Sequence, residues 1–206
     1  MDRDDDTLPE RLTALVRASF AEDDLSRRLV LDCLEAPDPR SRVLALRAAS
    51  RRELLATPAW LAALRDHDAG VRREALVAIA DGGGDATVLA ALVDLLDDDD
   101  ALVVEHAVFA LGERQYTPAL ARLMHVARDH EDARCREVAV ATLGVLGDDR
   151  ALAVVIGALD DKPAVRRRAV VALANFDGPE VAAALDRARD DHDWQTRAAV
   201  AQLEPD

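Results

Sequence analysis

The sequence predicts an all-α fold in which about six helical hairpins follow one another and wind into a right-handed α–α superhelix. Two observations predict it. A ten-residue pattern with a central alanine recurs along the chain, and the apolar residues are mainly Ala, Leu and Val. Aromatic residues make up only 3% of the 206 residues, although half of the chain is hydrophobic. This composition is typical of closely packed helices, whereas β-sandwiches use more aromatic side chains.

The recurring pattern has a nearly constant period. Its central alanines recur about every 30 residues, which suits two short helices and two turns in each repeat. Such regularity predicts one continuous domain over residues 1–206. The pattern is VRREALVAIA from Val71, VVEHAVFALG from Val103, CREVAVATLG from Cys135 and VRRRAVVALA from Val165, with weaker copies from Ser41 and Gln195.

Each repeat is expected to contain two helices. In the first, apolar residues occupy the first, fifth, sixth and ninth positions of the pattern, which is the spacing of a helix with one buried face. A turn rich in Gly and Asp follows, and then a second apolar stretch. We expect the second helices near residues 86–96, 117–128, 149–159 and 178–189.

The two ends of the chain depart from the pattern. Residues 8–36 predict a divergent helical pair, at 8–20 and 22–36, that caps the repeats over 38–203. The acidic residues 1–7 are expected to be disordered. The last first-type helix, about 193–203, has no second helix after it, so we expect it to close the stack.

The repeats resemble the HEAT-repeat proteins, and more narrowly the short bilin-lyase (PBS lyase) HEAT-like repeat branch, over about residues 38–203. The resemblance implies an armadillo-type solenoid. That branch includes scaffolds, lyase accessory proteins and enzymes, so two functions stay open. One is a scaffold that binds a partner protein or peptide in its groove. The other is a bilin-lyase-like auxiliary or catalytic protein that acts on a bound cofactor.

The charge of the chain limits its partners. The formal net charge is −14, from 40 acidic residues against 25 Arg and the single Lys162. Few Lys and many Asp resemble the surfaces of proteins from salt-loving organisms. The acidic balance disfavours binding to nucleic acid, which stays open as a third and less favoured function. The two cysteines lie far apart in the sequence, and neither an apolar leader nor an apolar stretch of membrane-spanning length is found. These features favour a cytoplasmic protein with no membrane contact. The sequence leaves the partner's identity and the oligomeric state open.

Acidic residues gather in the turns that precede the first helices. They are expected to cap helix N-termini, and arginines four residues later are expected to pair with them. In the third repeat Val104 takes the place of the arginine. The predicted i, i+4 pairs are Asp38 with Arg42, Asp68 with Arg72, and Asp132 with Arg136.

The sequence predicts no catalytic, cofactor-binding or metal-binding residue. His67, His130 and His192 lie in turns two repeats apart, so in a solenoid they cannot share an ion. The His-Glu dipeptides of deoxyhypusine hydroxylase, a HEAT-like di-iron enzyme, do not occur at the equivalent helix positions. Phosphate-binding glycine motifs are also absent. Cys33 and Cys135 fall at helical positions and are expected to be small apolar fillers.

The remaining candidates are contacts with a partner. The second helices should line the groove with small residues, which lets the backbone of a bound segment approach closely. The polar exceptions are Asp94, Arg122 and His125. The third repeat adds Val104, His106 and Tyr116, because positions that depart from a repeat pattern are free for a specific contact. We also expect Ala90, Ala91, Val154, Gly157, Ala183, Asp186 and Arg187 to be exposed along the groove.

Overall fold

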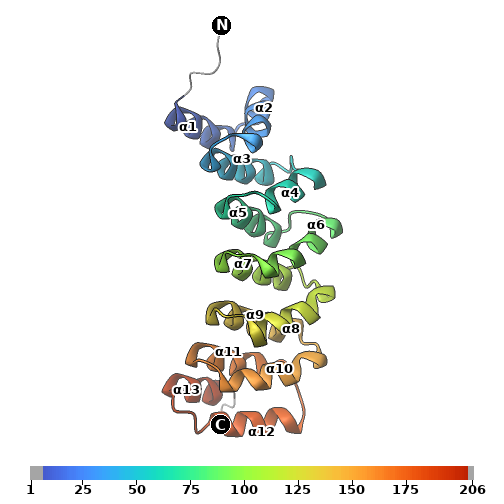
Figure 1. Cartoon of the computed structure of the whole chain (residues 1–206), viewed down its shortest axis with the longest axis vertical. Coiled ribbons are helices and arrows are strands. Elements are labelled where there is room, and N and C mark those ends of the chain that lie inside the picture. The colour runs from blue at the N-terminus through green and yellow to red at the C-terminus, as the bar shows by residue number, and fades with distance from the viewer. Residues whose placement is uncertain (1–6, 204–206) are drawn as a thin grey trace. The chain divides into compact units, whose positions relative to one another are not determined.

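The computed structural model describes residues 7–203. The expected disorder of residues 1–7 therefore falls, except for Thr7, outside the described part. The chain divides into two compact units, residues 1–92 and 93–206, and the boundary lies within the 3-10 segment η2 (Leu92–Asp97). Every regular element among the described residues is a helix, as Figure 1 shows.

The first unit begins with a helical pair and continues with alternating first and second helices of the repeats. The pair corresponds to the expected ranges 8–20 and 22–36. In this unit α3 contacts both α1 and α5, while α4 contacts α5 and α6. The elements are α1 (Leu8–Ala18), α2 (Asp24–Asp32), η1 (Cys33–Glu35), α3 (Pro39–Arg51), α4 (Thr57–Leu64), α5 (Ala69–Ala80) and α6 (Ala86–Ala91).

The second unit has two layers of helices. The first helices of the repeats, α7, α9, α11 and α13, contact one another in order, and α8 and α10 contact each other in the second layer (Figure 1). The elements are α7 (Ala101–Glu113), η3 (Thr117–Ala119), α8 (Leu120–Asp129), α9 (Ala133–Leu146), η4 (Asp149–Ala151), α10 (Leu152–Gly157), η5 (Ala158–Asp160), α11 (Pro163–Leu173), α12 (Pro179–Ala188) and α13 (Trp194–Leu203).

Five of the repeat alanines lie in the core, as the pattern predicted, whereas Ala199 in the copy from Gln195 is half-buried. Ala45, Ala75, Ala107, Ala139 and Ala169 are all fully buried. Small residues also set how closely neighbouring helices approach. A Cβ atom added to Gly144 of α9 would lie 2.7 Å from the Cβ of Ala172 on α11, so α9 and α11 pack nearly backbone to backbone.

Aspartates begin most of the first helices. The side chain of the residue before the helix accepts a backbone N–H at Asp38 before α3, Asp68 before α5, Asp100 before α7 and Asp132 before α9. A cap of this kind stabilises a helix by about 1 kcal/mol, and the negative charge favours the helix N-terminus. The expected capping role of the turn carboxylates is confirmed at these four helices.

The second helices are less regular than the apolar pattern indicated. The stretch expected at 149–159 is divided into η4, α10 and η5, so α10 itself has only six residues. The stretch expected at 86–96 likewise ends in the 3-10 segment η2. Segments of 3-10 helix tighten helix ends because each N–H bonds three residues back instead of four.

Candidate functional site

Arginines of the first helices join consecutive turns through ion pairs. We call the pairs Arg42–Asp66, Arg136–Asp161 and Arg166–Asp191 the turn ladder. Nε of Arg136 donates to Oδ2 of Asp161 at 2.6 Å, and its Nη2 donates to Oδ1 at 2.7 Å. Its Nη1 donates to carbonyl oxygens in the turn before α9. One side chain therefore links the turn before α9 to the turn before α11.

The other two pairs have the same geometry. Arg42 binds both oxygens of Asp66 at 2.7 Å within the first unit, and Arg166 binds both oxygens of Asp191 at 2.8 Å within the second. Hydrogen bonds from Arg136 hold the pKa of Asp161 below its usual value, and Arg166 does the same for the pKa of Asp191. These carboxylates remain charged.

Two of the predicted i, i+4 pairs, Asp38 with Arg42 and Asp132 with Arg136, are wrong, because these arginines bind Asp66 and Asp161. Asp38 accepts the backbone N–H of Ser41, and Asp68 accepts that of Val71. Asp132 binds Arg134 instead of Arg136, and the side-chain hydrogen bond from Arg134 lowers the pKa of Asp132 to about 2. The capping carboxylate is occupied by the helix start, so the arginine reaches the next turn.

The third repeat lacks the arginine of the turn ladder. Val104 stands on α7 where α3, α9 and α11 carry Arg42, Arg136 and Arg166, and its side chain is fully buried. The expected role of Val104 as a partner contact is therefore wrong, because a buried side chain packs against its own domain. No arginine side chain at this position of α7 can reach the turn before α9.

The turn before α9 also differs at the receiving end of the ladder. Asp66 and Asp191 each use Oδ1 to accept the backbone N–H two residues later, at 2.9 and 2.7 Å. In the turn before α9, Nδ1 of His130 accepts the N–H of Asp132 in the same way, at 3.1 Å. A histidine thus replaces the ladder carboxylate where a valine replaces its arginine.

Asp129 stands directly before His130 and has a different environment from the ladder carboxylates. Its side chain is 54% exposed, against 12% for Asp66, 18% for Asp161 and 13% for Asp191. His125, one turn earlier on α8, places Nδ1 2.9 Å from Oδ2 of Asp129. The C-terminal end of α8, directly before the turn that lacks a ladder arginine, therefore presents a carboxylate and an imidazole together at the surface.

The other predicted contact residues lie in two places. Asp94 is exposed on η2, while Arg122 on α8 pairs with Asp97 through its Nη2. Nε of Arg122 is buried without a hydrogen-bond partner among the described residues. His106 on α7 is half-buried, with Nδ1 2.6 Å from the carbonyl oxygen of Leu102 on its own helix.

Tyr116 is half-buried in the turn after α7. Its backbone N–H donates to the carbonyl oxygen of Leu111, which closes the end of that helix. His106 and Tyr116 thus belong to α7 and the turn that follows it. His125 and Arg122 belong to the second layer, on α8.

A cleft of about 270 Å³ lies between α8 and α10. Small residues form much of it, and a Cβ atom added to Gly157 would meet no atom within 4 Å. Val154, expected to be exposed, lines the cleft but is buried, so the expectation is wrong for this residue. The lining residues of this α8–α10 cleft are Ala127, Arg128, Ala153, Val154, Gly157, Ala158 and Asp161.

Arg128 connects the cleft to the exposed carboxylate. It lines the α8–α10 cleft, and its Nε is 3.8 Å from Oδ2 of Asp129. The sequence interpretation missed Arg128 and Asp129 as candidate residues. The sequence separation between the two residues of a ladder pair, counted forward from Val104, leads to Asp129 and the turn before α9. Together, the cleft and the neighbouring His125–Asp129 pair can recognise charge and hydrogen-bond donors next to a small-residue floor.

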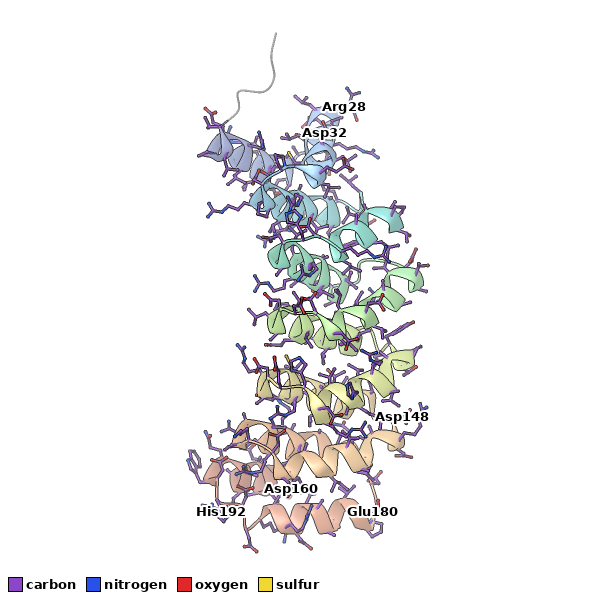
Figure 2. The ribbon with its side chains drawn as sticks, viewed as in Figure 1. Arg28, Asp32, Asp148, Asp160, Glu180 and His192 are labelled. Atoms are coloured by element: carbon purple, nitrogen blue, oxygen red, sulfur yellow. The ribbon has the colours of Figure 1, made fainter. Side chains whose placement is uncertain are left out.

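In the second unit, the turns before the second helices and the turn before α13 lie at opposite edges. Figure 2 shows Asp148 and Glu180, at the starts of second helices, at one edge and His192, in the turn before α13, at the other.

Within residues 7–203 no three His, Cys, Asp or Glu side chains gather as a metal site, and no helix there is long and apolar enough to cross a membrane.

Comparison with known proteins agrees with this architecture. A family model described as HEAT repeats matches residues 27–112, 57–144 and 120–204. No curated protein sequence matches the chain. Among solved structures, a designed armadillo repeat protein in complex with the peptide (KR)4 shares 19% identity at a TM-score of 0.59, covering 96% of this chain and 98% of that one.

A natural structure is also similar. The complex of CpcE and CpcF of phycocyanin lyase from Nostoc sp. PCC7120 shares 20% identity at a TM-score of 0.60, covering 89% of this chain and 79% of that one. A second designed armadillo repeat protein shares 21% identity at a TM-score of 0.58, covering 84% of this chain and 96% of that one. At these identities the likeness shows the fold, an α–α solenoid, and confirms the predicted fold class.

Proposed function

Because this chain belongs to the HEAT-repeat family, we propose that it is a non-catalytic scaffold that binds a protein or peptide segment along the α8–α10 cleft. The observation that carries the proposal is the chemistry of that cleft. Its floor consists of small side chains and Gly157, so a bound backbone can lie close to the helices. Arg128 and Asp161 supply charges beside that floor.

Two further observations support a binding role. The ladder and capping interactions already engage many of the charged side chains, whereas His125 and Asp129, next to the cleft residue Arg128 on α8, remain more than half exposed. The designed armadillo repeat protein similar to this chain holds the peptide (KR)4, which gives a precedent for peptide binding on such a fold. We place the scaffold in the cytoplasm, since both cysteines are free thiols, which is typical of a reducing compartment.

Selection from a displayed peptide library tests this proposal. The matched variants are Gly157→Leu, which adds a side chain in the cleft at a position where a Cβ atom meets nothing within 4 Å, and Ala201→Leu, which adds the same type of bulk on the exposed surface of α13. We expect peptides selected on the wild type to lose binding to Gly157→Leu and to keep binding to Ala201→Leu. Selected peptides that bind both variants equally would show that the cleft is not the binding site.

The likeness to the CpcE and CpcF complex supports one alternative, a bilin-lyase-like auxiliary role. Such a role requires the protein to hold a tetrapyrrole. Titration with an open-chain tetrapyrrole distinguishes the two functions, because binding changes the absorption and induces circular dichroism of the pigment. A spectrum equal to that of the free pigment would remove this alternative and leave the scaffold proposal untouched.

A further inference from the structure

We propose that Asp129, with His125 beside it, is an acceptor for an arginine side chain of a basic peptide bound at the α8–α10 cleft. This inference rests on the proposed function, since it names the chemistry of the segment that the cleft holds. It assigns a role to the surface beside the turn before α9, which receives no ladder arginine because α7 carries Val104 at that position.

The ladder shows how carboxylates in these turns are used. In three places an arginine binds a turn carboxylate with two hydrogen bonds, at 2.6 to 2.8 Å. A guanidinium matches a carboxylate in this two-point way, and such charge-assisted bonds are about twice as strong as neutral ones. At the junction of α7 with the turn before α9, the two ladder positions hold Val104 on α7 and His130 in the turn. Asp129, the last residue of α8, therefore stands beside this turn with no arginine bound to both of its carboxylate oxygens.

The carboxylate also retains free hydrogen-bonding capacity. A carboxylate can accept about four hydrogen bonds. Nδ1 of His125 lies 2.9 Å from one carboxylate oxygen, and Nε of Arg128 at 3.8 Å is too far for a hydrogen bond. Because more than half of the Asp129 side chain is exposed, a guanidinium from outside can reach it.

The charge of the second unit favours a cationic partner. Residues 93–206 contain 23 Asp and Glu against 13 Arg and Lys, a net charge of −10 out of −14 for the chain. A field of this sign attracts basic segments and raises their association rate. Arg128 borders both the cleft and Asp129, so a backbone lying in the cleft brings its side chains to the acceptor.

Fluorescence anisotropy with a labelled octapeptide of alternating Lys and Arg tests the acceptor at physiological ionic strength. We expect Asp129→Asn to weaken binding by about tenfold, the effect of losing one charge-assisted hydrogen bond. The matched control is Asp177→Asn, which removes one negative charge from the exposed turn before α12. It should change binding less than about twofold, because distant surface charges are screened.

A second peptide separates recognition of arginine from attraction to positive charge. An octapeptide of lysine alone carries the same charge but cannot donate the two parallel hydrogen bonds of a guanidinium. We expect the wild type to bind the Lys/Arg octapeptide at least about threefold more tightly than the lysine octapeptide. Asp129→Asn should bind the two peptides equally, whereas Asp177→Asn should keep the wild-type preference.

The outcomes separate this inference from the proposed function. Equal binding of the Lys/Arg octapeptide by wild type, Asp129→Asn and Asp177→Asn overturns the role of Asp129, as does the absence of any octapeptide binding by the wild type. Either result leaves the cleft to be judged by Gly157→Leu. If Gly157→Leu retains every selected peptide while Asp129→Asn loses the octapeptide, the cleft proposal fails and the acceptor remains.

Discussion

Arg136 on α9 binds both carboxylate oxygens of Asp161 in the turn before α11, and so joins two successive turns of the solenoid. Both side chains are largely buried. Removing one member of such a pair destabilises the folded protein, because the remaining charged side chain stays buried without its partner. The ladder therefore contributes to stability chiefly where it is complete.

Replacing Asp161 by Asn should destabilise the protein by about 2 kcal/mol near neutral pH, since Arg136 loses a charge-assisted pair. The pKa of Asp161 is lower in the folded chain than the unfolded value of about 3.9, so its contribution is present above that value. It is lost as the pH falls through the folded pKa. Denaturant titrations from neutral to acid pH should show the two proteins converging, with Asp177→Asn indistinguishable from wild type throughout.

The interrupted ladder position can be rebuilt with two substitutions. Val104→Arg alone introduces a guanidinium that has no ladder carboxylate to bind in the next turn. His130→Asp alone introduces a carboxylate that has no ladder arginine. Neither single substitution should therefore stabilise the protein. The double variant should be more stable than the two single effects predict, by about 1 to 2 kcal/mol, the size of coupling expected for residues in contact. Urea unfolding of all four proteins measures this coupling. Purely additive effects would show that positions 104 and 130 do not face each other.

Replacing each of two helical glycines by alanine should change the stability of the protein in opposite directions. A Cβ atom on Gly144 would lie 2.7 Å from Cβ and 2.8 Å from Cα of Ala172, so Gly144→Ala should cost about 1 to 3 kcal/mol. Gly157 faces open space with a helical backbone, so Gly157→Ala should stabilise by up to about 1 kcal/mol. Melting temperatures of the two variants check this. A drop for both would contradict the open environment of Gly157.

The cysteines should be unreactive in the folded protein. Burial raises the pKa of the Cys135 thiol to about 11, and its Sγ lies 3.2 Å from the carbonyl oxygen of Ala101. Burial also raises the pKa of Cys33. A disulfide reagent at mildly alkaline pH should therefore label neither thiol until denaturant is added, when both react. Rapid labelling of the native protein would contradict the burial of these side chains.

The two tryptophans should differ in their access to a quencher. Trp60 is 5% exposed and its ring packs against Gly83, whereas Trp194 is 66% exposed at the start of α13. Acrylamide should quench the fluorescence of Trp60→Phe strongly and that of Trp194→Phe weakly. Equal quenching constants for the two variants would show that one of these environments is wrong.

The period of the alanines was enough to predict the first helices, because a residue such as Ala139 must be small where helices pack closely and its position repeats. The 3-10 ends around α10 were missed, since an apolar pattern of helical period does not show whether a short helix tightens at its ends. The partner of Arg136 was also missed. Sequence proximity favours Asp132, but capping occupies that carboxylate, and the next turn becomes the neighbour only after folding.

The contact candidates were predictable only in part. Exposed polar positions such as Asp94 and His125 follow from the helical period of the second helices. The sequence shows that Val104 departs from the arginine of the repeat pattern. The effect of this departure lies one repeat later, at Asp129 and His130, where no ladder arginine arrives. Only the folded structure, in which the ladder arginines reach the next turn, shows this relationship. A substitution in a repeat array can thus act one repeat away from where it occurs.

The turn ladder also gives the second unit an uneven stiffness. Two-point ion pairs tie α9 to the turn before α11 and α11 to the turn before α13, whereas α7 sends no such tie to the turn before α9. Under a pulling force applied to its ends, a stack of helices separates first at the junction that the fewest bonds cross. Side-chain hydrogen bonds from Cys135 and Thr142 cross the α7–α9 junction, but no two-point ion pair of the turn ladder does. We therefore expect this unit to bend there more readily than at the junctions that the ladder ties, and the α7–α9 junction lies beside the surface to which we assign a partner.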